Sequence, residues 1–144
     1  MTATELIQII TGFLGSLGFA ILYNIRGKKL IAASLGGFFS WTLYILLGFG
    51  IQSEALRYFL VALLLSGYAE LMAKLFKTPT TTFVIISLIP LIPGGSLYYT
   101  MASVFESDLN LFLDNAVHTL ELAMALALGI VATSAIAKMV RKKG

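Results

Sequence analysis

Five long apolar stretches follow one another along the chain, separated by short polar segments. Each stretch is close to the roughly 20 residues that an α-helix needs to cross the hydrocarbon core of a bilayer. Because the connections are short, consecutive helices should be antiparallel neighbours. The pattern therefore predicts an all-α membrane helix bundle that forms one transmembrane domain over residues 1–144. Its predicted spans are residues 6–25, 30–51, 56–75, 83–104 and 116–136.

The fourth stretch contains residues that interrupt helices. Pro93 lacks the N–H that would bond to the preceding turn, Gly94 and Gly95 follow it directly, and Pro90 lies one turn earlier. We expect two half-helices that meet near residues 92–95, at about the middle of the membrane. Non-helical backbone at this depth is tolerated where it is buried in protein or lines a wet cavity, and secondary transporters bind solutes at such breaks. The break is therefore a candidate solute site, with a kinked structural helix as the alternative.

Polar and aromatic residues flank the broken stretch. Thr78 is expected to cap a helix whose first turn begins at Pro79, and Thr80 belongs to the same threonine-rich segment. Tyr98 follows the break and is a candidate to face the same cavity. Packing, or a place in the aromatic belt of the membrane interface, is the alternative for this tyrosine. We count Tyr98 among the predicted binding or gating residues and the two threonines as secondary candidates.

Composition supports the membrane interpretation. The 144 residues are 58% hydrophobic and 12% charged, and the mean hydropathy is +0.92. A soluble domain carries roughly 25% charged residues, and so short a chain cannot bury this much apolar surface in a core of its own. The basic residues stand in short clusters between apolar runs, which is typical of membrane loops rather than of nucleic-acid binding.

The basic clusters also predict an orientation. Nine of the ten lysines and arginines lie after the first span, at or just after the end of the third span, or in the C-terminal tail, and Arg57 is the exception. The positive-inside rule places these three segments in the cytoplasm. Five spans then put the N-terminus outside and the C-terminus inside.

Three ionisable residues lie within or at the edge of apolar spans: Glu70, His118 and Glu121. Charges in hydrocarbon are costly, so each is a site candidate. Glu70 precedes Lys74 by four residues, an order that favours an ion pair on one helix, so a structural role is equally consistent with its position. His118 and Glu121 are three residues apart and share a helix face. Glu121 lies deeper, where a poorly hydrated carboxyl group is suited to carrying a proton.

Enzyme chemistry is not indicated. The chain has no cysteine and one histidine, which excludes zinc–thiolate and iron–sulfur sites. It has no nucleophile triad, and the glycine pair in the fourth stretch lacks the lysine and serine of a phosphate-binding loop. We therefore expect no catalytic residue, no metal and no cofactor.

Small residues recur at every fourth position in three spans, which allows helix backbones to approach closely. Each series predicts either packing within the chain or an interface with another subunit. The series are Gly12, Ser16 and Ala20; Ala32, Gly36 and Ser40; and Ala125, Gly129, Thr133 and Ala137.

Three segments resemble the threonine/serine exporter family, in its small-subunit form that corresponds to the C-terminal half of the complete transporter. They are residues 23–30 (Tyr-Asn-Ile-Arg-Gly-Lys-Lys-Leu), residues 69–80, and residues 89–95 (Ile-Pro-Leu-Ile-Pro-Gly-Gly) followed by a tyrosine pair. The resemblance covers nearly the whole chain. One departure is Ile86-Ser87, where a further Pro-Gly pair is expected, so the first half of the fourth span should be more regular than is usual.

The resemblance implies a multi-pass protein of the bacterial cytoplasmic membrane. Its partner would be a larger transmembrane subunit, and its solute would be threonine, serine or a dicarboxylate such as succinate. Because no nucleotide-binding motif is present, export is expected to be driven by an ion gradient. Two alternatives are a non-transporting scaffold or regulatory subunit and a self-sufficient homo-oligomeric channel or pump.

The predicted orientation can be tested with single cysteines, since the chain has none of its own. On intact cells, Ser53→Cys and Ser107→Cys should react with a membrane-impermeant thiol reagent, because both positions are predicted to lie outside. Lys142→Cys should react only after the membrane is permeabilised. Labelling of Lys142→Cys but not of Ser107→Cys on intact cells would contradict the orientation.

Overall fold

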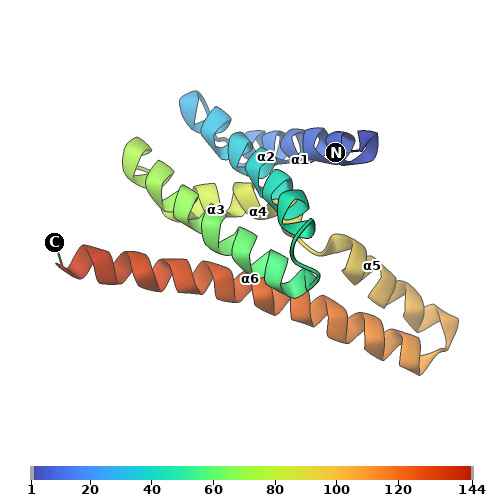
Figure 1. Cartoon of the computed structure of the whole chain (residues 1–144). Helices are drawn as coiled ribbons and strands as arrows, with labels where there is room; N and C mark the ends of the chain where they lie inside the picture. The colour runs from blue at the N-terminus through green and yellow to red at the C-terminus, as the bar shows by residue number, and fades with distance from the viewer. Residues whose placement is uncertain (1, 144) are drawn as a thin grey trace.

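The chain is helical throughout, as the pattern of apolar stretches predicts. The computed structural model describes residues 2–143 and contains no strand within that range. Figure 1 shows the arrangement of the helices. They are α1 (Ala3–Leu22), α2 (Lys28–Gly48), α3 (Glu54–Phe76), α4 (Thr80–Leu88), α5 (Gly94–Ser103) and α6 (Leu109–Lys143), with short 3-10 helices η1 (Ile89–Leu91) and η2 (Val104–Glu106).

Four helices, namely α1, α2, α3 and α6, are each long and apolar enough to cross a membrane. Helices α4 and α5 are too short alone, but together they pass the same test across a bend of 55°. The bundle of about five spans and the break of its fourth span are thus confirmed. Helix α6 has 35 residues, or about 52 Å at 1.5 Å per residue. It extends beyond the predicted residues 116–136 at both ends, because helical hydrogen bonding continues through the polar residues that flank the apolar stretch.

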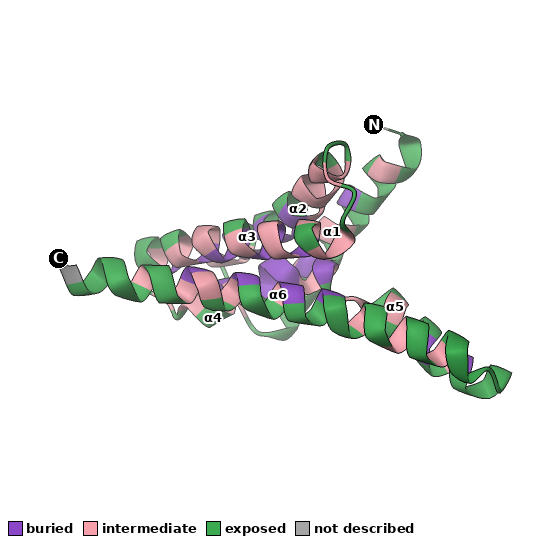
Figure 2. Ribbon diagram, turned by 60° about the horizontal axis from the view of Figure 1, so that its bottom comes forward, coloured by how far each residue is buried: buried purple, intermediate pink, exposed green. Residues whose placement is uncertain are grey.

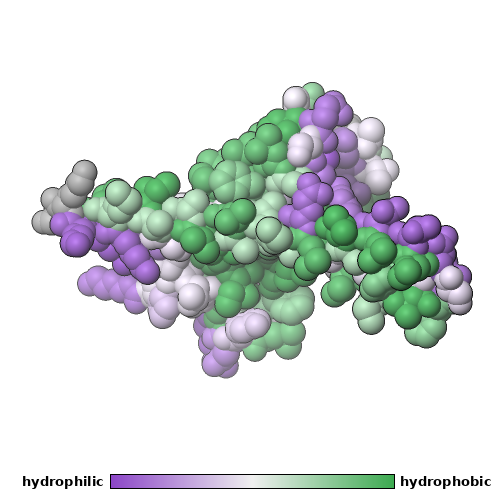
Figure 3. Space-filling model, turned by 90° about the horizontal axis from the view of Figure 1, so that it is seen from below, coloured by the Kyte–Doolittle hydropathy of each residue, from purple (hydrophilic) through white to green (hydrophobic). Residues whose placement is uncertain are grey.

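Successive spans run in opposite directions, with α4 and α5 counted as one bent span. In Figure 1 the α1–α2 connection, the α3–α4 connection and the C-terminus lie on the left, and we call this side the basic end. The N-terminus, the α2–α3 connection and the α5–α6 turn lie on the right, the opposite end. Figure 3 shows hydrophilic residues gathered towards the two ends and a hydrophobic surface between them. The arrangement collects nine of the ten basic residues at one end, whereas the orientation of that end in a membrane stays a prediction.

The start of α4 differs from the prediction that Thr78 caps it. Helix α3 ends at Phe76, and its C-cap residue Lys77 has a φ of 50°, in the left-handed region that commonly terminates helices. The Thr78 hydroxyl turns back and donates to the carbonyl of Phe76 at 3.0 Å. Helix α4 therefore begins one residue later than predicted, at Thr80, with Pro79 as its N-cap residue and no side chain capping it.

Small residues bring α1, α2 and α4 into close contact. A Cβ atom at Gly37 would lie 1.9 Å from Oγ of Ser16, and one at Gly36 would lie 1.8 Å from Oγ of Ser87. Any side chain at either glycine would therefore force the helices apart. Ser16 and Ser87 are fully buried, and Figure 2 shows the buried residues concentrated in the middle of the bundle. The small-residue series of α1 and α2 thus packs within the chain.

The series on α6 packs within the chain as well. A Cβ atom at Gly129 would lie 2.7 Å from the Cβ of Ala62 and 2.7 Å from the carbonyl oxygen of Phe59, both on α3. One turn further along, the Thr133 hydroxyl donates to the carbonyl of Leu63 at 2.9 Å. Of the two alternatives left open by the sequence, packing against α3 is the correct one. Gly129 is buried there and is not available as a contact for another subunit.

Helix α5 occupies a different position from the other helices. It packs mainly on the N-terminal part of α6, and the hydroxyls of Thr100 and Thr119 lie 3.0 Å apart across this contact. Figure 1 shows the α5–α6 turn projecting away from the rest of the bundle. Large apolar side chains on α5 and η2 therefore remain exposed, including Leu97, Met101 and Phe105.

The α3–α6 contact makes a stability prediction. Gly129→Leu should lower the free energy of unfolding by about 1–3 kcal/mol, because the new side chain meets backbone atoms of α3 that cannot move independently. Gly67→Leu on α3 is the matched control, since a Cβ atom there meets no other part of the described chain within 4 Å. Unfolding by SDS in mixed micelles, followed through the single tryptophan, measures the difference. Equal SDS midpoints for the two variants would contradict the packing.

Candidate functional site

The break between α4 and α5 follows from two prolines. Pro90 has no N–H, so the carbonyl of Ile86 loses the donor that a regular helix would supply. The hydroxyl of Ser16 on α1 takes this place and donates to the Ile86 carbonyl at 3.1 Å in a buried position. The backbone then tightens into η1, where the N–H of Ile92 donates to the carbonyl of Ile89 at 3.2 Å. Ser16 was noted in the sequence only as a small residue, and its role as a donor depends on a contact 70 residues away.

Helix α5 begins directly after the break. Its N-cap residue is Pro93, and no side chain caps the helix. Gly94 and Gly95 are exposed, and a Cβ atom at either would meet no other part of the described chain within 4 Å. The first N–H groups of a helix have no partners within the helix and carry its positive dipole end. In this chain that end is uncovered, so the glycines are not there to allow close packing within the chain.

A hollow lies beside the break on the side of α1 and α2. It has a volume of about 250 Å³ and is lined by Gln8, Thr11, Gly12, Trp41 and Pro90. The indole Nε1–H of Trp41 donates to Oε1 of Gln8 at 3.4 Å across it. Pro90, a predicted site residue, therefore borders an open hollow that offers an amide and a hydroxyl group. Gln8 and Thr11 were not singled out by the sequence, because polar residues near the end of an apolar stretch are common, and Gly12 was noted only as a small residue.

Charged and aromatic side chains from α2, α3 and α6 meet at the opposite end. The carboxylate of Glu54 accepts a hydrogen bond from the Tyr44 hydroxyl at 2.9 Å through one oxygen. Its other oxygen lies 3.2 Å from Nε2 of His118 on α6. The guanidinium of Arg57 lies over the Tyr44 ring, 4.8 Å from its centroid. We call these four residues the Glu54 cluster.

The Glu54 cluster adjoins the hollow through aromatic contacts. The Trp41 ring, which lines the hollow, stacks on Tyr44 with centroids 5.1 Å apart. Tyr58 packs edge-on against Tyr44 at 5.4 Å and is itself buried. Of this group, the sequence singled out only His118 as a site candidate. The available signal for Arg57 was that it is the one basic residue outside the three basic clusters.

The two glutamates predicted as site candidates lie apart from the break. Glu70 pairs with Arg141 of α6 at the basic end, rather than with Lys74 as expected. The Arg141 side chain is 55% exposed, so this pair contributes little to stability. Glu121 is exposed on α6. His118, three residues earlier, points to Glu54 instead, so the structure brings one of these predicted residues into a cluster and leaves the other outside it.

The remaining predicted residues are also distant from one another. Thr78 and Thr80 lie at the basic end, one α4 length before Pro90. Tyr98 is on α5 near the break, but its side chain is 69% exposed and packs edge-on against Tyr99 at 5.5 Å. Among residues 2–143, no group of three or more histidine, aspartate or glutamate side chains could hold a metal ion.

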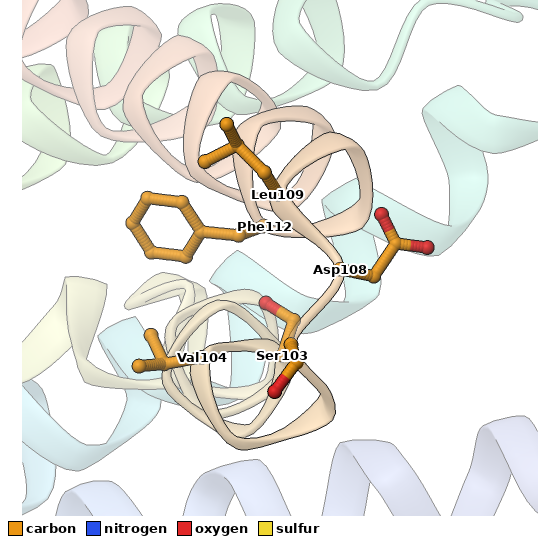
Figure 4. A pocket seen from close by; sticks show the side chains of 6 residues that line it. Ser103, Val104, Asp108, Leu109 and Phe112 are labelled. Carbon is orange, nitrogen blue, oxygen red and sulfur yellow. The ribbon is translucent and has the colours of Figure 1, made fainter.

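A second hollow, of about 330 Å³, lies at the α5–α6 turn. Figure 4 shows the side chains of Val104, Leu109 and Phe112 around it, while the Asp108 side chain points away. One Asp108 oxygen instead accepts from the N–H groups of Asn110 and Leu111, at 3.0 and 3.1 Å, and caps α6. This hollow is an apolar surface feature of the helical turn and offers little to a polar solute.

Comparison with known proteins identifies the family. A family described as "Threonine/Serine exporter, ThrE" matches residues 8–136, a range that contains the break, the hollow and the Glu54 cluster. No curated protein and no solved structure matches the chain. A match over nearly the whole chain, to a bundle of apolar helices with one broken span, shows that this protein belongs to the threonine/serine exporter family.

Proposed function

We propose that this chain is one half of an exporter of threonine and serine in the bacterial cytoplasmic membrane, and that it works with a larger transmembrane subunit. Membership of a transporter family and several apolar helices support transport across a membrane. The observation that carries the proposal further is the open break between α4 and α5. Unpaired helical N–H groups in an apolar region are costly unless a solute, water or another protein segment covers them.

The chemistry at the break suits a small solute with a carboxylate. The N–H of Gly94 donates to the carbonyl of Ile92 at 2.6 Å. The following N–H groups at the N-terminus of α5 and its positive dipole end favour an anionic group. The adjoining hollow adds the Gln8 amide and the Thr11 hydroxyl, which can bond to a polar side chain such as that of serine or threonine. A dicarboxylate such as succinate shares the carboxylate and is a further candidate solute.

The surface that this chain leaves uncovered supports the proposal of a partner. Gly94 and Gly95 face open space, and α5 has one main neighbour. Solute sites of secondary transporters commonly lie between two sets of helices. A larger subunit that packs against α5 would enclose the break and cover its exposed apolar side chains. In this arrangement the basic end faces the cytoplasm, and the Glu54 cluster faces outward.

The proposal predicts that Gly95→Leu abolishes threonine export while the protein remains inserted. The leucine side chain would fill the space over the α5 N-terminus, where we place the solute. Gly18→Leu on α1 is the matched control, because Gly18 is also an exposed helical glycine without neighbours within 4 Å in the described chain. Export of labelled threonine from proteoliposomes containing this chain and the larger subunit measures the effect.

Export by Gly95→Leu at the wild-type rate would contradict the assignment of the break to the solute path. Proteoliposomes that contain only this chain provide a second arm of the same experiment, and no export is expected from them. Robust threonine flux through this chain alone would contradict the two-subunit arrangement and favour a homo-oligomeric transporter instead.

A further inference from the structure

We propose that Arg57 binds the carboxylate of the exported solute and that Glu54, which accepts a hydrogen bond from the Tyr44 hydroxyl, binds its ammonium group. This inference rests on the proposed function, because it assigns a binding step to the same solute path. Arg57 and Glu54 lie in the first turn of α3, at the end of the molecule opposite the basic end. They would hold the solute near the outward opening of the path.

Arg57 forms no ion pair within 4 Å among the residues that the structure describes. Its guanidinium covers the Tyr44 ring, and Nε is buried without a hydrogen-bond partner. The neighbouring carboxylate of Glu54 is instead occupied by Tyr44 and His118. An arginine whose Nε is removed from water without an acceptor favours binding of a carboxylate, whose two oxygens match the geometry of a guanidinium.

The backbone makes room for this guanidinium. Gly48 is the last residue of α2, and a Cβ atom there would lie 3.0 Å from Nη1 of Arg57. The absence of a side chain at Gly48 therefore leaves room for the guanidinium beside Tyr44. Trp41, Tyr44 and Gly48 follow one another on a single face of α2. This face leads from the hollow beside Pro90, past the Trp41–Tyr44 stack, to Arg57.

The pairing of charges favours an amino acid over a dicarboxylate. Arg57 offers a positive group and Glu54 a negative one on the same tyrosine ring, which matches the carboxylate and ammonium of a zwitterion. A carboxylate has about four acceptor positions, so Glu54 can bind an ammonium group while it keeps its contacts with Tyr44 and His118. A second carboxylate would meet Glu54 and be repelled.

Competition during export tests the assignment. With both subunits in proteoliposomes, the concentrations of unlabelled threonine, threoninamide and succinate that halve export of labelled threonine would be compared. Threoninamide lacks the carboxylate but keeps the ammonium group. In the wild-type protein, threonine should compete best. In Arg57→Gln, the concentration of threonine that halves export should rise at least about tenfold. The concentration of threoninamide that halves export should not change.

Two further variants complete the design. Arg57→Lys keeps the charge but loses the fork, so it should show a smaller rise and serves if Arg57→Gln does not insert. Lys74→Gln removes an exposed basic residue at the basic end and should behave as wild type.

Equal rises of the half-inhibiting concentrations of threonine and threoninamide would overturn the proposal and indicate that Arg57 binds lipid phosphate or supports the fold. Succinate competing as well as threonine in the wild-type protein would overturn the role of Glu54. Absence of threonine export by the wild-type pair would instead count against the proposed function.

Discussion

A backbone carbonyl buried among apolar side chains has no water to bond with, and the structure around the break between α4 and α5 follows from this constraint. Pro90 removes the donor for the Ile86 carbonyl, and the buried hydroxyl of Ser16 replaces it. Leaving such a group unpaired costs about 1–3 kcal/mol, more than a typical hydrogen bond contributes in net terms. Ser16 therefore acts mainly by removing a penalty, and it does so while leaving the chain free to change direction at the break.

This hydrogen bond requires α1 to lie unusually close to α2 and α4. Gly37 accommodates Ser16, and Gly36 accommodates Ser87, at distances that no side chain would permit. The three helices thus form a rigid support on one side of the break, and Leu91 of η1 is anchored in a buried cluster with residues of α3 and α6. The other side of the break, at the start of α5, has no comparable support from residues 2–143. A rigid wall facing an open helix terminus is an arrangement suited to a solute that a partner subunit encloses.

The sequence predicts the parts of this arrangement that depend on neighbouring residues. Five apolar stretches indicated the helices, and Pro93 with the two glycines indicated the break, because hydropathy and missing donors are local properties. Contacts between distant residues left no comparable signal, as the Ser16–Ile86, Thr133–Leu63 and Glu70–Arg141 pairs show. For the same reason, the small-residue series predicted close approach but not the partner helix. The expected cap at Thr78 was wrong because a left-handed residue at Lys77 turned the chain before the hydroxyl could reach α4.

The central claim is that the start of α5 lies on a water-accessible solute path and not against lipid. Ser96 lies in the first turn of α5, and the chain has no native cysteine, so Ser96→Cys places a single thiol beside the break. In the transporter assembled with a cysteine-free larger subunit, we expect a small hydrophilic thiol reagent to label this position. Threonine at saturating concentration should slow the labelling. A cysteine that stays unlabelled, or one whose labelling rate is unaffected by threonine, would contradict the account.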